Sequence, residues 1–101
     1  MQSDQITVEE FIEKLMLNEP IFVLDVREED EYHAFNIEGH LIPLGQLASR
    51  LDEIPRDIPI VVHCRSGHRS QAAVDFLKQN GITAKNLVGG ILAWQQAIGT
   101  P

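Results

Sequence analysis

The sequence predicts an α/β fold in which a small, mainly parallel sheet is flanked by helices on both faces. Apolar runs that suit strands alternate along the chain with amphipathic segments that suit helices. A chain of 101 residues buries one modest core, so we expect a single domain over residues 1–101. The composition, 44% hydrophobic and 23% charged, is typical of a folded globular chain.

The first part of the chain predicts a helix, a buried strand and a short acidic helical turn. Thr7 followed by Glu10 is a capping box, and apolar residues at helical spacing predict a helix over about residues 8–17. A continuous apolar run rich in β-branched residues predicts a buried strand at PIFVLDV. The acidic turn is expected at EEDEYHAF, directly after this strand.

The middle of the chain predicts a small strand, a helix and the second core strand. The small strand is expected at GHLIPL and the helix at GQLASRLDEI, with Leu47, Leu51 and Ile54 available for burial. The core strand is expected at RDIPIVVHC, where Pro59 is tolerable because it stands at the start.

The last part predicts two helices around a short strand. The strongest helical pattern is SQAAVDFLKQNG, which Gly81 ends. A short strand is expected at TAKNLV, a tight turn at GG and a closing helix at ILAWQQAI. Trp94 lies at helical spacing in this closing helix, so we expect it to pack in the core.

Charge and cysteine usage limit the partners and the compartment. The net charge of −7 at pH 7 repels nucleic acid and anionic membranes, so we expect neither as a partner. No apolar run has the length of a membrane span, and the first residues, MQSDQITVEE, do not resemble a signal peptide. The single cysteine cannot form an internal disulfide, which agrees with a reducing compartment. We therefore expect a cytoplasmic protein.

The only cysteine, Cys64, stands where the second core strand ends and a helical pattern begins. In parallel α/β sheets, ligands bind beyond the carboxyl ends of the strands. The next residues, RSGHR, include a glycine that lets the backbone bend. Amide groups of such a loop and of the helix that follows can converge on one point, where the helix dipole adds positive potential. We expect a small anion-binding cradle that faces Cys64.

This environment predicts a reactive thiol. Positive potential favours the thiolate, so the pKa of Cys64 should lie below the value of about 8.5 for free cysteine. Arg65 and Arg69 add positive charge that does not titrate at ordinary pH. Such a sulfur is suited to attack on an anionic substrate. The alternative is an inert, buried cysteine, which is the common state of free thiols.

Several charged residues near this site have a structural interpretation beside a functional one. His63 alternates with Cys64, so we expect a satisfied core histidine rather than a catalytic base. His68 either assists proton transfer or is simply a solvated loop residue. For Asp25 and Arg27 we expect a structural ion pair, with Glu31 as a candidate partner of Arg27.

The length of the loop indicates which anion it handles. Cysteine-dependent phosphatases place an arginine after five intervening residues, which makes a ring wide enough for phosphate. Here Arg69 follows Cys64 after only four residues, and Ser70 occupies the phosphatase position. We expect the shorter loop to hold one extra sulfur on Cys64 as a persulfide.

Three motifs then resemble those of the single-domain rhodaneses, a sulfurtransferase family, and the resemblance covers nearly the whole chain. The motifs are DVREEDEY, HCRSGHRS and NLVGGILAW. The resemblance implies that Cys64 is the nucleophile and persulfide carrier. It also implies a substrate-binding loop made of Arg65, Ser66, Gly67, His68 and Arg69. One departure is GHLIP, which is one residue shorter than in many members and has His40 in place of an alanine. Similar short versions resemble the rhodanese-like domains fused to sulfur-carrier-activating enzymes.

The resemblance implies thiosulfate sulfurtransferase activity. A small anionic sulfur donor such as thiosulfate would load Cys64, and a thiol, a protein acceptor or cyanide would remove the sulfur. One alternative is a non-enzymatic persulfide-carrying or regulatory module. A less favoured alternative is a small phosphatase or arsenate reductase, which would need a longer loop than this sequence has. We expect no cofactor and no metal, since one cysteine with no second ligand at suitable spacing makes a poor metal site.

Overall fold

The sheet is parallel throughout. The computed structural model describes residues 4–99, which form a five-stranded sheet with the order β1-β5-β4-β2-β3 and parallel pairing at every neighbour. The strands are β1 (Gln5–Ile6), β2 (Phe22–Asp25), β3 (His40–Leu41), β4 (Ile60–His63) and β5 (Lys85–Leu87). The predicted α/β class is confirmed.

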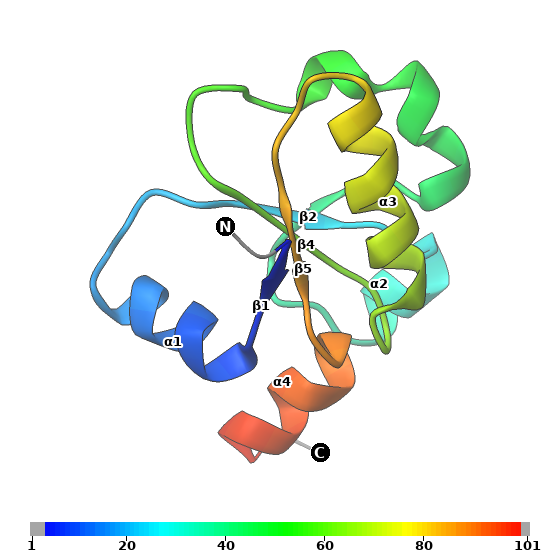
Figure 1. Cartoon of the computed structure of the whole chain (residues 1–101). Coiled ribbons are helices and arrows are strands. Elements are labelled where there is room, and N and C mark those ends of the chain that lie inside the picture. The colour runs from blue at the N-terminus through cyan, green and yellow to red at the C-terminus, as the bar shows by residue number, and fades with distance from the viewer. Residues whose placement is uncertain (1–3, 100–101) are drawn as a thin grey trace.

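Helices cover both faces of the sheet, as predicted. Helices α1 and α4 lie together on one side, and α3 lies on the other with the two 3₁₀ segments η1 and η2 (Figure 1). The helices are α1 (Val8–Met16), α2 (Glu29–Ala34), α3 (His68–Gln79) and α4 (Gly90–Ile98), and the 3₁₀ segments are η1 (Leu44–Ser49) and η2 (Leu51–Glu53).

The core has two parts because the side chains of β4 alternate between the faces. Val62 and Cys64 are buried in the cluster beneath α3, whereas Val61 is buried in the cluster beneath α1 and α4. Trp94 is half-buried against the second cluster, with its ring centroid 5.6 Å from that of Phe11. The predicted core role of Trp94 is confirmed.

The segment GQLASRLDEI does not form the predicted α-helix. It forms η1 and η2, which are separated by Arg50 at φ −127° and ψ 22°. These backbone angles interrupt the helical path after six residues. Leu47 is buried, and Ile54 is buried just after η2, so the segment still covers the core at its two ends.

Two further boundaries differ from the prediction. Helix α3 begins at His68 rather than Ser70, because Gly67 adopts the left-handed φ of 111° and starts the helix directly after it. His68 and Arg69 therefore belong to the first helical turn, not to the loop. Strand β1 was not predicted, since its two residues are too few for a periodic signal and depend on pairing with β5.

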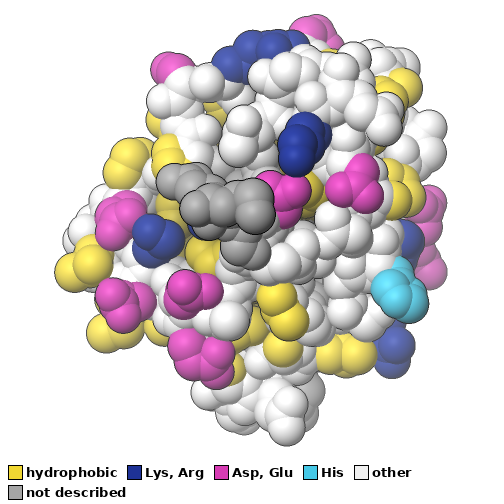
Figure 2. Space-filling model, in the orientation of Figure 1, with side chains coloured by type: hydrophobic (Ala, Val, Ile, Leu, Met, Phe, Trp, Pro, Cys, Tyr) yellow, Lys and Arg dark blue, Asp and Glu magenta, His cyan; other side chains and the backbone are white. Residues whose placement is uncertain are grey.

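The surface over α1 is acidic. Glu9, Glu10 and Glu13 project from this amphipathic helix, whose Val8 and Phe11 are buried. Figure 2 shows acidic side chains at the lower left, over α1, among exposed hydrophobic ones. None of the helices between residues 4 and 99 is long and apolar enough to span a bilayer.

Gly90, the first residue of α4, lies against the backbone that follows β4. The amides of Ile91 and Leu92 donate to the carbonyls of Cys64 at 2.9 Å and Arg65 at 3.1 Å. A Cβ atom on Gly90 would lie 2.6 Å from each of these two carbonyl oxygens, and the residue has the left-handed φ of 58°. Only glycine fits this position without a backbone shift.

We expect Gly90→Ala to destabilise the protein by about 2–4 kcal/mol, because the methyl group clashes with backbone that cannot rotate away. Urea unfolding measures this change. Gly45→Ala is the matched control, since a Cβ atom at Gly45 meets no atom within 4 Å. Equal stability of the two variants would contradict the close approach of α4 to this loop.

Candidate active site

Cys64 lies at the carboxyl end of β4, beneath a short loop and the first turn of α3. Its Sγ accepts hydrogen bonds from the amide of Gly67 at 3.1 Å and from the amide of Ser70 at 3.4 Å. The hydroxyl oxygen of Ser70 lies 3.3 Å from the same sulfur. The loop and the helix start thus supply several donors to one atom.

Helix α4 sets the direction in which the loop amides point. The Arg65 carbonyl is bound by the amide of Leu92 at 3.1 Å. Because C=O and N–H point in opposite directions across a trans peptide, the amide of Ser66 is turned away from α4 and toward the sulfur. The amide of Gly67, in the next peptide, also donates to Sγ, and the left-handed φ of 111° at Gly67 then turns the chain into α3.

These donors lower the pKa of the Cys64 thiol. Burial is the largest single influence and raises the pKa, because it disfavours the charged sulfur. The Ser70 hydroxyl and the amides of Ser70, Gly67 and Ser66 act in the opposite direction and together outweigh burial. The net pKa is lower than that of an ordinary cysteine, in the predicted direction, and the cause is hydrogen bonding to the sulfur.

Cys64 is buried more deeply than we expected for a residue that faces an anion-binding cradle. Only 1% of the residue is exposed, and its side chain packs with Ala73 and Val74 in the cluster beneath α3. The short loop of residues 65–67 that covers the sulfur is itself at or near the surface, with Arg65 and Ser66 exposed.

The residues predicted to form the substrate-binding loop differ in exposure and in pairing. Arg65, Ser66 and His68 are exposed, and the Arg65 guanidinium forms no hydrogen bond or ion pair within residues 4–99. Arg69 instead forms a two-pronged ion pair with Glu31 of α2, at 2.6 and 2.9 Å. This hydrogen-bonded pair lowers the pKa of Glu31 to about 2 and raises that of Arg69.

Asp25 and Arg27 form the expected structural ion pair, but with each other. Arg27 Nη2 lies 2.7 Å from Asp25 Oδ2, and the two side chains are 4% and 0% exposed. The predicted pairing of Arg27 with the Glu31 carboxylate is wrong, because that carboxylate binds Arg69. Arg27 instead donates to the backbone carbonyls of Glu31 and Phe35, and so fixes α2 beside β2.

His63 is buried, as predicted, but it is not fully satisfied. Its Nε2 has no hydrogen-bond partner in the described part of the chain and lies 3.6 Å from Asp25 Oδ2. Burial lowers the pKa of His63, although the Asp25 carboxylate opposes this effect. The imidazole points to the opposite face of the sheet from Cys64, so it does not serve as a base for the thiol.

Ser70 and Asn86 belong to the site and were not assigned to it from the sequence. The Ser70 hydroxyl donates to Asn86 Oδ1 at 2.5 Å, and both residues are buried. Asn86 is in β5, and the fold brings it within hydrogen-bond distance of Ser70. The role of Ser70 could have been predicted from the sequence, because a residue in the first helical turn after the loop can face back toward the end of the strand.

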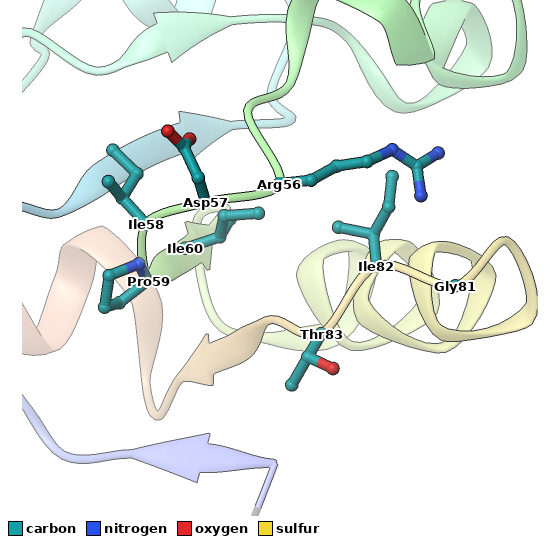
Figure 3. A pocket seen from close by; sticks show the side chains of 8 residues that line it. All are labelled: Arg56, Asp57, Ile58, Pro59, Ile60, Gly81, Ile82 and Thr83. Atoms are coloured by element: carbon teal, nitrogen blue, oxygen red, sulfur yellow. The ribbon is translucent and has the colours of Figure 1, made fainter.

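A cavity of about 370 Å³ lies at the other end of β4. Its polar lining residues include Arg56, Asp57 and Thr83 (Figure 3). All three are exposed. Because Ile60 at the start of β4 lines it, the cavity is separated from Cys64 by the length of the strand. Cys64 takes no part in it.

The arrangement of strands, loop and helices matches known proteins along almost all of the described chain. A crystal structure of a rhodanese-like domain protein from Staphylococcus aureus has a TM-score of 0.84 and 32% identity, and the match covers 89% of each chain. A rhodanese-related protein from Thermoplasma volcanium has a TM-score of 0.84 and 33% identity, covering 96% of this chain and 94% of its own.

Curated sequences give the same result. A protein named sulfurtransferase from Allochromatium vinosum is 36% identical over 98 residues, covering 90% of this chain and 87% of its own. YrkF of Bacillus subtilis, whose name describes a sulfur carrier protein, is 36% identical over 92 residues, and this chain spans 50% of its length. The Rhodanese-like domain family matches residues 7–97. The chain therefore belongs to the rhodanese-like family.

Proposed function

We propose that this protein is a sulfurtransferase that carries sulfur on Cys64 as a persulfide, taking it from an anionic donor such as thiosulfate. The observation that supports this proposal most strongly is the set of donors around Sγ, with amides at 3.1 and 3.4 Å and a hydroxyl oxygen at 3.3 Å. Such donors stabilise a sulfur anion without a metal or a neighbouring base.

The reaction consists of two displacements. The Cys64 thiolate attacks the outer sulfur of thiosulfate, a new S–S bond forms, and sulfite leaves with the electron pair of the broken bond. The outer sulfur of the persulfide then carries the negative charge. A thiolate acceptor, or cyanide, attacks that outer sulfur, and Cys64 leaves as the thiolate with which the cycle began.

The loop is better suited to this chemistry than to phosphoryl transfer. Only three residues, 65–67, separate Cys64 from α3, and the amides already converge on Sγ itself. Ser70 stands where a phosphatase would need its arginine, and its hydroxyl faces the sulfur. A phosphate would need a wider ring of donors than this loop provides.

Arg65, in the loop, and Arg69, in the first turn of α3, have different parts in donor binding. Arg65 is exposed and is not paired with any residue of the described chain, so it is available for the sulfonate group of the donor. Arg69 must first leave Glu31, or share its guanidinium with it. Glu31 thus competes with an anionic donor for Arg69.

A persulfide carrier that serves one protein acceptor is a second candidate function. The 1% exposure of Cys64 favours it, because an enclosed sulfur restricts small reagents. The name of YrkF is consistent with such a role. Turnover separates the two functions: an enzyme cycles on thiosulfate with cyanide or a thiol, whereas a carrier gains one sulfur and turns over negligibly.

We expect wild-type protein treated with thiosulfate to gain the mass of one sulfur atom, which cyanide removes. Cys64→Ser should gain nothing and lose all thiosulfate-dependent transfer, because the alcohol is not a comparable nucleophile. Intact-protein mass spectrometry and a thiocyanate assay measure these two results, with circular dichroism as the control for folding. Transfer by Cys64→Ser would refute the proposed function.

We expect Glu31→Gln to lower the KM for thiosulfate by roughly threefold to tenfold, because it releases a half-exposed arginine from its anionic partner. Arg69→Ala should raise the KM by a similar factor. Steady-state kinetics at low ionic strength measures both changes. Glu29→Gln is the matched control, since it removes the same charge from the same helix without touching Arg69. Equal effects of Glu31→Gln and Glu29→Gln on the KM would contradict a specific competition of Glu31 for Arg69, because the loss of any one negative charge from α2 would then suffice.

A further inference from the structure

The Ser70 hydroxyl has one proton and two neighbours that can accept it. In the structure it donates to Asn86 Oδ1 at 2.5 Å, and its oxygen lies 3.3 Å from Cys64 Sγ. Ser70 and Cys64 are 0% and 1% exposed and Asn86 is 5% exposed, so bulk water does not supply an alternative partner. The three side chains form a buried relay.

Two glutamines fix the direction of the Asn86 amide. Asn86 Nδ2 donates to Gln5 Oε1 at 3.0 Å and to Gln71 Oε1 at 3.3 Å. Gln5 Nε2 also donates to Gln71 Oε1. Gln71 Nε2 donates to the Asp75 carboxylate, which can only accept, and this fixes the orientation of the Gln71 amide. The carbonyl oxygen of Asn86 is therefore held toward Ser70, where it acts as an acceptor.

The protonation state of Cys64 decides whether the Ser70 hydroxyl donates to Cys64 Sγ or to Asn86 Oδ1. When Cys64 is a thiol, its S–H can donate to Ser70 Oγ while the hydroxyl donates to Asn86. When Cys64 is ionised, no S–H remains, and the anionic sulfur becomes the stronger acceptor. The hydroxyl can then rotate toward the sulfur and leave the Asn86 carbonyl.

We propose that Ser70 and Asn86 are positioning residues that set the ionisation of Cys64 in opposite directions, through one hydroxyl proton that both the sulfur and the Asn86 carbonyl can accept. Ser70 stabilises the thiolate by donating to it. Asn86 opposes the thiolate by competing for that donor. The inference deepens the proposed function, because the ionised sulfur is the attacking group there.

The same rotation fits both displacement steps. Once the persulfide forms, the negative charge moves to the outer sulfur, Sγ becomes a neutral bridging atom, and the hydroxyl returns to Asn86. When an acceptor takes the outer sulfur, the S–S bond breaks and Sγ keeps its electron pair. The hydroxyl then turns back to stabilise the departing thiolate.

Alkylation of Cys64 by iodoacetamide across a pH series tests this relay without requiring any sulfur transfer. We expect Ser70→Ala to raise the pKa in the alkylation profile and to slow alkylation at neutral pH by about fivefold to tenfold. Asn86→Leu, which keeps the shape but removes the competing carbonyl, should lower that pKa and speed alkylation at neutral pH severalfold. The ultraviolet absorbance of the thiolate gives an independent titration.

The double variant separates this relay from a general structural effect. Because Asn86 acts through the serine, Ser70→Ala combined with Asn86→Leu should titrate like Ser70→Ala alone. Ser49→Ala is the matched control, since Ser49 is exposed and, among residues 4–99, its hydroxyl bonds only to the Gln46 carbonyl. It should titrate like wild type.

An unchanged pKa in Ser70→Ala would overturn the relay, and so would shifts of the same sign in Ser70→Ala and Asn86→Leu. If Asn86→Leu does not fold, Asn86→Ala replaces it, and Ser70→Ala alone still decides whether the hydroxyl matters.

Sulfur loading is measured separately by mass. If the pKa in the alkylation profile shifts as expected in the variants but Cys64 of the wild type never gains sulfur, the proposed function fails and the relay stands. If Cys64 loads normally and no variant shifts, the relay alone fails.

Discussion

Two hydrogen bonds from the amino end of α4 hold the backbone of Cys64 and of the loop that follows it. They bind the carbonyls of Cys64 and Arg65, and the opposite sides of those peptides then face away from α4. With the Arg65 carbonyl held by α4, the Ser66 amide of the same peptide points toward Sγ. Gly90 makes this contact possible by its lack of a side chain. The closing helix, distant in sequence from Cys64, thus shapes the site.

The sulfur is stabilised by dipoles more than by net charge. The chain carries −7 at pH 7, the buried Asp25–Arg27 pair is neutral as a unit, and Glu31 neutralises Arg69. Within residues 4–99, Arg65 is the loop cation that has no such partner. Backbone and hydroxyl dipoles are fixed in direction and need no counterion, so they hold a small anion where full charges are balanced elsewhere.

Local sequence patterns were enough to predict the two core strands, the position of Cys64 at the end of β4, and helices close to α1, α3 and α4. They failed where a residue depends on a partner far along the chain. Arg69 pairs with Glu31, 38 residues away, and Ser70 with Asn86, 16 residues away. No periodicity encodes such contacts. The helix expected after Pro43 failed for a local reason, since Arg50 leaves the helical region and divides the segment.

The two edges of the sheet are formed by its shortest strands. β1 and β3 have two residues each, while the central strand β4 has four. An edge of this length offers few unpaired backbone groups to a strand from another molecule. The long hydrophobic strands lie inside, where both of their sides are already paired. This arrangement protects a fully parallel, apolar sheet against edge-to-edge aggregation.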